Sequence, residues 1–182
     1  DKIFYYTTCG WMMWNWLVSS LACGSTVVLY EGNPFYPNKS SLLKIMNKTN
    51  INIFGTSAKY ISYLKSVDCF PKEKGSFSKL RTILSTGSPL TEDLFDFVYK
   101  FWKKDVQLSS ISGGTDIISC FALGSPTLPV KRGEIQTIGL GMSVKSYSDD
   151  GTHQYNIKGE LVCDKAFPSM PIYFWNDDKN EK

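Results

Sequence analysis

A short segment between two β-prone runs carries the residue types that a metal-bound phosphate needs. It reads SSISGGTDIIS over residues 109–119, with two glycines followed by a hydroxyl and a carboxylate. Glycines let the backbone approach an anionic ligand closely, and successive N–H groups can bind an anion. The Thr115 hydroxyl can donate to a phosphate oxygen, and the Asp116 carboxylate can bind Mg²⁺. A plain turn, with Thr115 and Asp116 capping local backbone groups, remains the alternative.

A second segment of small residues, TGSPL over residues 86–90, has a similar character. Backbone groups of Gly87, Ser88 and Pro89 could frame a planar base, or the segment could simply lead into a helix. Neither segment decides the matter alone. If both leave the same edge of a sheet, a nucleotide site is favoured.

The elements that must position these segments alternate between strand and helix patterns. The predicted strands are 26–30, 51–54, 80–85 and 106–110, and the predicted helices are 38–50, 55–67 and 90–102. Strands separated by helices indicate a parallel sheet with right-handed crossovers, and ligands bind beyond the carboxyl ends of such strands. Both small-residue segments follow predicted strands, so they should meet at one edge.

The first thirty residues are rich in aromatic side chains and contain no charge from Ile3 to Tyr30. The pattern predicts an opening strand and then a buried helix near 11–23 that ends at Gly24. A membrane span is the alternative, but interspersed polar residues and the change to a β pattern oppose it. Trp11 and Met12 are typical of a core, although methionines also line acyl pockets.

Composition and the later part of the chain narrow the class of protein. The net charge of +3 comes from scattered lysines, which does not favour nucleic acid. Five well-separated cysteines without a CxxC motif indicate a reducing compartment, and we expect a cytoplasmic protein. The lone His153 and the lack of GxSxG or HExxH oppose nucleophilic or zinc hydrolysis. Beyond residue 130, short β runs and an Asp-Gly turn predict a small antiparallel lobe.

The ordered motifs resemble the adenylate-forming superfamily, and within it the acetoacetyl-CoA synthetases. The likeness covers nearly the whole chain and rests on four stretches. They are YYTTCGWMMWNWLVSSLACGSTVVLYEG, LRTILSTGSPL, ISGGTDIISCFALGSPTLPVKRGEIQTIGLGM and GELVCDKAFPSMPIYFWND. The resemblance implies an acid–thiol ligase of ketone-body and lipid metabolism. MgATP converts acetoacetate to an acyl-adenylate, and coenzyme A then displaces AMP. Another short acid, or a nucleotide-binding module without catalysis, is the alternative.

The resemblance also implies roles for individual residues. The ATP- or AMP-binding set is Gly87, Ser88, Pro89, Ser110, Ile111, Ser112, Gly114 and Thr115, and Thr115 is also catalytic through the α-phosphate. Asp116 stands where the family usually has a glutamate that binds Mg²⁺. Asp is one methylene shorter, so a water can intervene between it and the metal. The acyl pocket is implied to comprise Trp11, Met12, Met13, Thr86 and Gly113.

Gly113 stands where acetyl-specific relatives have a tryptophan that closes the pocket. We therefore expect Gly113 to admit the longer acid and Gly113→Trp to shift preference towards acetate. The resemblance implies an α/β subdomain over 1–128 and part of a β-rich subdomain over 129–182. By the same comparison, the phosphate-binding loop, the ribose-binding residues and the mobile C-terminal domain are absent. An internal fragment without these partners is expected not to turn over.

Overall fold

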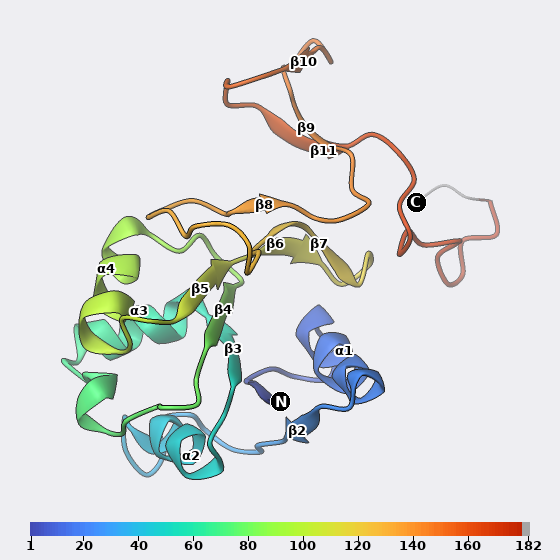
Figure 1. Ribbon diagram of the computed structural model, residues 1–182. Helices are drawn as coiled ribbons and strands as arrows, with labels where there is room; N and C mark the ends of the chain where they lie inside the picture. Colours follow the sequence, from blue (N-terminus) through green and yellow to red (C-terminus); the bar gives the residue numbers. More distant parts are fainter. Residues whose placement is uncertain (180–182) are drawn as a thin grey trace.

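A five-stranded parallel sheet forms the body of the molecule (Figure 1). The computed structural model describes residues 1–179. The strand order is β2-β1-β3-β4-β5, and every neighbouring pair is parallel. The strands are β1 (Lys2–Tyr5), β2 (Thr26–Val28), β3 (Ile53–Ser57), β4 (Thr82–Thr86) and β5 (Gln107–Ser110). The expected fold class, a parallel α/β sheet with a small antiparallel part, is confirmed.

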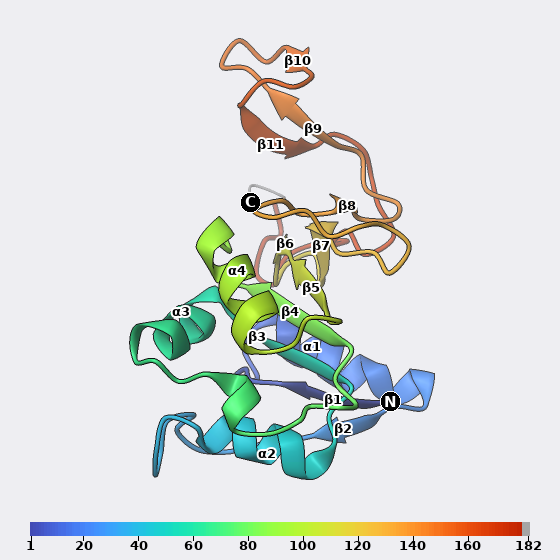
Figure 2. The same ribbon diagram turned by 60° about the vertical axis from the view of Figure 1, so that its left-hand side comes forward.

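Helices cover both faces of this sheet (Figure 2). They are α1 (Met12–Ser19), α2 (Ser41–Thr49), α3 (Ala58–Ser66) and α4 (Glu92–Phe101). Successive side chains of a strand point to opposite faces, and β1 shows the result. Phe4 is buried in the core that the sheet shares with α2, α3 and α4, whereas Tyr5 packs with residues of α1. The sheet therefore lies between two layers of helices.

The helix ends follow local chemistry. A 3₁₀ turn, η1 (Ser20–Cys23), extends α1 to Gly24, whose φ of 70° is left-handed and ends the helix as predicted. The Ser57 hydroxyl accepts a hydrogen bond from the Tyr60 N–H at 3.2 Å and caps α3. Thr91 precedes α4, but its hydroxyl donates to the Asp93 carboxylate instead of capping the backbone.

An antiparallel sheet follows β5 directly. Its strands are β6 (Ser112–Gly114), β7 (Ser119–Leu123) and β8 (Thr137–Ile138), in the order β6-β7-β8. The glycine-rich segment expected to be a loop is thus partly a strand, and only the turn at 115–118 is loop-like. The expected division between residues 128 and 129 runs through this sheet, because β8 pairs with β7. Antiparallel pairing begins at Ser112, well before that division.

A third sheet projects away from the body (Figure 1). It joins β9 (Val144–Tyr147), β10 (His153–Gln154) and β11 (Glu160–Cys163) in the order β10-β9-β11. Large apolar side chains in the segments before and after this sheet in the chain face solvent, among them Leu140, Ile172 and Trp175. Among residues 1–179, no helix has the length and apolar character needed to cross a membrane.

A carboxylate with several donors joins two strands of the third sheet. The Ser143 hydroxyl donates to Asp164 at 2.6 Å, the Tyr147 hydroxyl donates at 3.3 Å, and Lys145 forms an ion pair with it. The Lys145 and Ser143 bonds lower the pKa of Asp164 to about 2, from an ordinary value of about 3.9. Because the folded-state pKa is lowered, Asp164 stabilises the sheet above about pH 4, and this contribution disappears as the pH falls towards 2.

We therefore expect Asp164→Asn to loosen the third sheet at pH 5 but not at pH 2. The measurement is the rate at which pepsin cleaves within residues 143–164, compared with the unaltered protein at each pH. Asp149→Asn, in the neighbouring exposed turn, serves as the control. Equal cleavage of the Asp164→Asn and Asp149→Asn proteins at pH 5 would contradict the expected role of Asp164.

Candidate functional site

The segments that follow β1, β4 and β5 line one cavity of about 610 Å³ at the carboxyl end of the sheet. Its wall consists of Trp11, Met12, Met13, Thr86, Gly87, Ser88, Pro89, Leu90, Ser110, Ile111, Ser112, Gly113, Gly114, Thr115, Gly133 and Ile135. The cavity thus brings together every residue expected to contact nucleotide or acid. Asp116, the expected metal ligand, is not part of this wall.

The two small-residue segments are held side by side by the sheet itself. Strands β4 and β5 are parallel neighbours, with Ser85 opposite Ser110. The Ile111 N–H donates to the Ser85 carbonyl at 2.9 Å, so the pairing continues beyond the end of β5. Gly87 follows with a left-handed φ of 84°, which lets the chain turn away above the sheet. Two segments separated in sequence therefore face one cavity.

Helix α1 supplies the apolar end of the cavity. Trp11 precedes the helix in an extended conformation and remains 55% exposed, whereas Met12 and Met13 are buried. The two methionines belong to a cluster on the α1 side of the sheet. The buried members of this cluster are Tyr5, Met12, Met13, Leu17, Ile111 and Cys120. An apolar wall with few polar atoms suits the carbon chain of a small acid.

The β6–β7 hairpin approaches its own backbone closely at Gly113. A Cβ on Gly113 would lie 2.2 Å from the Ser119 carbonyl oxygen and 2.8 Å from the Cys120 Cα. The strand register also shifts between Ser112 and Gly113. The hairpin therefore requires glycine at position 113 for a reason separate from ligand size. At Gly114 a Cβ would meet nothing within 4 Å.

Thr115 and Asp116 lie in the turn between β6 and β7, and both are exposed. The Ile118 N–H donates to the Thr115 carbonyl at 3.1 Å and closes this turn. Thr115 is a residue of the cavity wall, and Asp116 is next to it in the chain. Residues 1–179 contain no group of three or more histidine, cysteine or acidic residues that could hold a metal. One carboxylate suffices for Mg²⁺ when substrate phosphates and water supply the other oxygens.

Three wall residues, Leu90, Gly133 and Ile135, were not expected from the sequence. Leu90 directly follows the TGSP segment, and its buried side chain could have been assigned to the predicted helix alone. Gly133 and Ile135 belong to the segment between β7 and β8, which returns to the cavity from the antiparallel sheet. Only the left-handed φ of 78° at Gly133 has a sequence signal, because glycine favours that conformation.

A buried thiol packs in the apolar cluster that includes Met12 and Met13 of the cavity wall. Burial raises the pKa of Cys120 to about 12, and its side chain is fully enclosed among the α1-side residues. A thiol reacts with alkylating reagents through its thiolate. We therefore expect iodoacetamide at pH 8 to leave Cys120 unlabelled in the folded protein and to label it after unfolding, as measured by peptide mass spectrometry. Rapid labelling of folded protein would show that the cluster around Cys120 opens.

The fold and the cavity define a class of protein that a family comparison identifies. The family model for AMP-binding enzymes matches residues 1–171, so the chain belongs to that family. Curated relatives include acetoacetyl-coenzyme A synthetase of Rhizobium meliloti (strain 1021), 53% identical over 182 residues. Acetoacetyl-CoA synthetase of Danio rerio is 50% identical over 182 residues. Both matches cover all of this chain, but it spans only 28% and 27% of the two relatives.

Two solved structures also resemble this chain. Acetoacetyl-CoA synthetase from Streptomyces lividans superposes with a TM-score of 0.92 at 42% identity. That match covers 99% of this chain and 28% of the solved chain. The anthranilate CoA ligase AuaEII in complex with anthranoyl-AMP superposes with a TM-score of 0.77 over 88% of this chain and 30% of its own. At 18% identity, it supports the fold alone.

Proposed function

We propose that this chain is part of an acetoacetate–CoA ligase. In the proposed reaction, an acetoacetate carboxylate oxygen attacks the α-phosphorus of ATP, forms acetoacetyl-AMP and releases pyrophosphate. The coenzyme A thiolate then attacks the acyl carbon and releases AMP. The observation that carries the proposal is the single cavity that combines two small-residue segments at the carboxyl end of a parallel sheet with a methionine-rich wall.

The nucleotide is assigned to the end formed by β4 and β5. Gly87, Ser88 and Pro89 would border one side of the adenine, and Ser110 to Ser112 would lie along the other. Gly114 leaves room for the phosphate chain, because nothing lies within 4 Å of the position of its missing Cβ. The Thr115 hydroxyl would donate to the α-phosphate and stabilise the charge that develops there.

The acid is assigned to the end formed by α1. Trp11, Met12 and Met13 would form the wall of the acyl pocket, and Thr86 would form its floor. The Thr86 hydroxyl donates to the Ile111 carbonyl at 3.4 Å, which holds this side chain against the β5 end of the sheet. Flexible methionines adapt to a small branched or keto-containing chain. We retain Gly113 as the residue that makes room for four carbons, with the hairpin constraint described above.

Mg²⁺ is the cofactor of the proposed reaction, and Asp116 is its proposed protein ligand. Bound between phosphate oxygens, the ion would neutralise charge on ATP. In the proposed full-length enzyme, the segments that the relatives have outside the matched region would supply the phosphate-binding loop. They would also supply the C-terminal domain that completes the site. We also propose a cytoplasmic, reducing location, which the five free cysteines of the described chain support.

The test is a panel of carboxylic acids offered to the full-length protein with MgATP and coenzyme A. Release of AMP should be fastest with acetoacetate, slower with butyrate and 3-hydroxybutyrate, and slowest with acetate. A different preferred acid would retain the ligase but overturn the substrate. AMP binding without acid-dependent AMP release would instead indicate a nucleotide-binding module.

A further inference from the structure

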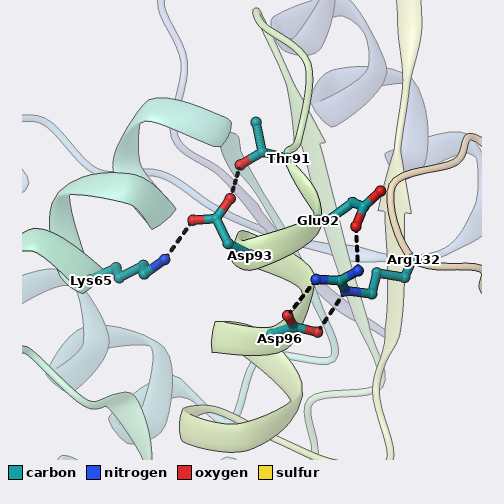
Figure 3. A network of polar contacts seen from close by, with 6 residues as sticks. All are labelled: Lys65, Thr91, Glu92, Asp93, Asp96 and Arg132. Atoms are coloured by element: carbon teal, nitrogen blue, oxygen red, sulfur yellow. Dashed lines mark hydrogen bonds and ion pairs between the residues drawn. The ribbon is translucent and has the colours of Figure 1, made fainter.

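An ion-pair network fastens one wall of the cavity to helix α4 (Figure 3). The wall segment lies between β7 and β8 and contributes Gly133 and Ile135 to the cavity. Arg132, which adjoins Gly133, reaches across to two carboxylates on the first turns of α4. These charged residues do not line the cavity, so any effect that they have on a ligand must be indirect.

The contact between Arg132 and α4 is specific in geometry. The Arg132 Nε donates to Asp96 Oδ1 at 2.9 Å, and its Nη2 donates to Asp96 Oδ2 at 2.9 Å. This is a bidentate pair, in which the planar guanidinium matches the carboxylate. The remaining Nη1 donates to Glu92. One side chain therefore bridges two carboxylates that lie one helical turn apart.

The same contact reaches the nucleotide end of the cavity. A Cβ on Gly133 would lie 2.8 Å from the Glu92 Cγ, so the backbone of the wall segment lies directly against the Glu92 side chain at the start of α4. Leu90, two residues before Glu92, lines the same cavity at the end of the TGSP segment. Gly133 and the TGSP segment are thus fixed relative to each other through the start of α4.

The network is suited to positioning rather than to global stability. The side chains of Arg132, Glu92 and Asp96 are 54 to 62% exposed, and exposed ion pairs contribute little to unfolding free energy. The base of the wall segment has a separate attachment, because Gln136 donates to the Leu128 carbonyl at 2.7 Å and to the Ser125 carbonyl at 3.0 Å. Loss of Arg132 should therefore shift the wall without unfolding it.

We propose that Arg132 is a positioning residue for the nucleotide end of the cavity, holding the Gly133–Ile135 wall against the segment that borders the adenine. The assignment rests on the proposed function. It implies that ATP affinity depends on Arg132 although Arg132 does not touch ATP. The acid, which is assigned to the opposite end of the cavity, should bind independently of Arg132.

The test compares Arg132→Gln with Lys65→Gln in the full-length enzyme. Lys65, on α3, pairs with Asp93 of α4 but does not touch the wall segment. Lys65→Gln is therefore a matched loss of one exposed charge that contacts α4. For Arg132→Gln, we expect the KM for ATP to rise by up to about tenfold. This is the size of change in affinity that the loss of one exposed ion-pair network can cause. The KM for acetoacetate, kcat and thermal midpoint should stay near those of Lys65→Gln. Arg132→Lys retains the charge but not the planar guanidinium that makes the bidentate contact, so its KM for ATP should be intermediate.

Two results would overturn the assignment. One is an ATP KM for Arg132→Gln equal to that of Lys65→Gln. The other is a parallel rise in both KM values with a lowered thermal midpoint, which would indicate a purely structural role. If the unaltered enzyme releases no AMP with any acid, the proposed ligase function fails on its own. Calorimetric titration with AMP then decides the role of Arg132, because weaker binding by Arg132→Gln than by Lys65→Gln supports it and equal or absent binding rejects it.

Discussion

Thr115→Val in the full-length enzyme is expected to lower kcat/KM for acyl-adenylate formation by about 10²- to 10³-fold. Thr115 is an exposed residue of the cavity wall, and its backbone carbonyl closes the β6–β7 turn. Valine keeps the shape and removes only the hydroxyl. A donor aimed at developing charge on a reacting phosphate or carbonyl contributes about 3–4 kcal/mol to catalysis. Acetoacetate-dependent exchange of pyrophosphate into ATP measures this step.

Thr115→Ser is the matched control, because it retains the hydroxyl and loses only a methyl group. It should keep activity within about tenfold of the unaltered enzyme, since only positioning of the hydroxyl changes. The thermal midpoint should be unaffected in both variants, because surface substitutions seldom change stability by more than about 0.5 kcal/mol. Near-normal exchange by Thr115→Val would remove Thr115 from the catalytic group.

Gly113→Ala and Gly114→Ala should differ sharply in stability although the two glycines are neighbours. At Gly113 the added methyl group would collide with the Ser119 carbonyl oxygen on β7, and backbone atoms cannot move aside cheaply. Such overpacking costs about 1–3 kcal/mol. At Gly114 the same methyl group enters open space. Thermal midpoints, together with hydrogen exchange of the β6 and β7 amides, measure the difference.

The constraint also changes the expected behaviour of Gly113→Trp. A tryptophan at this position can narrow the acyl pocket only if β7 moves, so preference for acetate should increase together with faster hydrogen exchange in the hairpin. Unchanged acid preference would refute the proposal that Gly113 makes room for acetoacetate. Normal exchange protection in Gly113→Ala would contradict the close approach itself. The two variants therefore separate ligand size from hairpin geometry.

Most of the parallel sheet could be predicted from the sequence because its signals are local. Each helix presents an apolar stripe, such as Leu94, Phe95 and Val98 of α4, and short strand patterns alternate with these helices along the chain. Strand β6 was missed because Ser112–Gly114 contains two glycines, which disfavour strands. It forms through pairing with β7, and the sequence of β6 alone does not encode that partner.

The cavity was predictable where it follows the ends of strands and unpredictable where it depends on distant packing. The TGSP and SGGT segments follow β4 and β5 in sequence, so the topology of a parallel sheet is enough to bring them together. Residues Gly133 and Ile135 reach the cavity only after two antiparallel strands and a long connection. Their position depends on the contacts of Arg132 and Gln136, which no local pattern reveals.

The position of β1 in the sheet has a consequence for synthesis on the ribosome. Strand β1 precedes β2 and β3 in the chain, yet it lies between them in the sheet. Ile3 cannot pair with Ile53 until some fifty further residues have been translated, so Phe4 stays uncovered during that interval. A nascent chain that pauses within this stretch would display an apolar strand with an unpaired edge, which is the kind of surface that chaperones bind and that promotes aggregation.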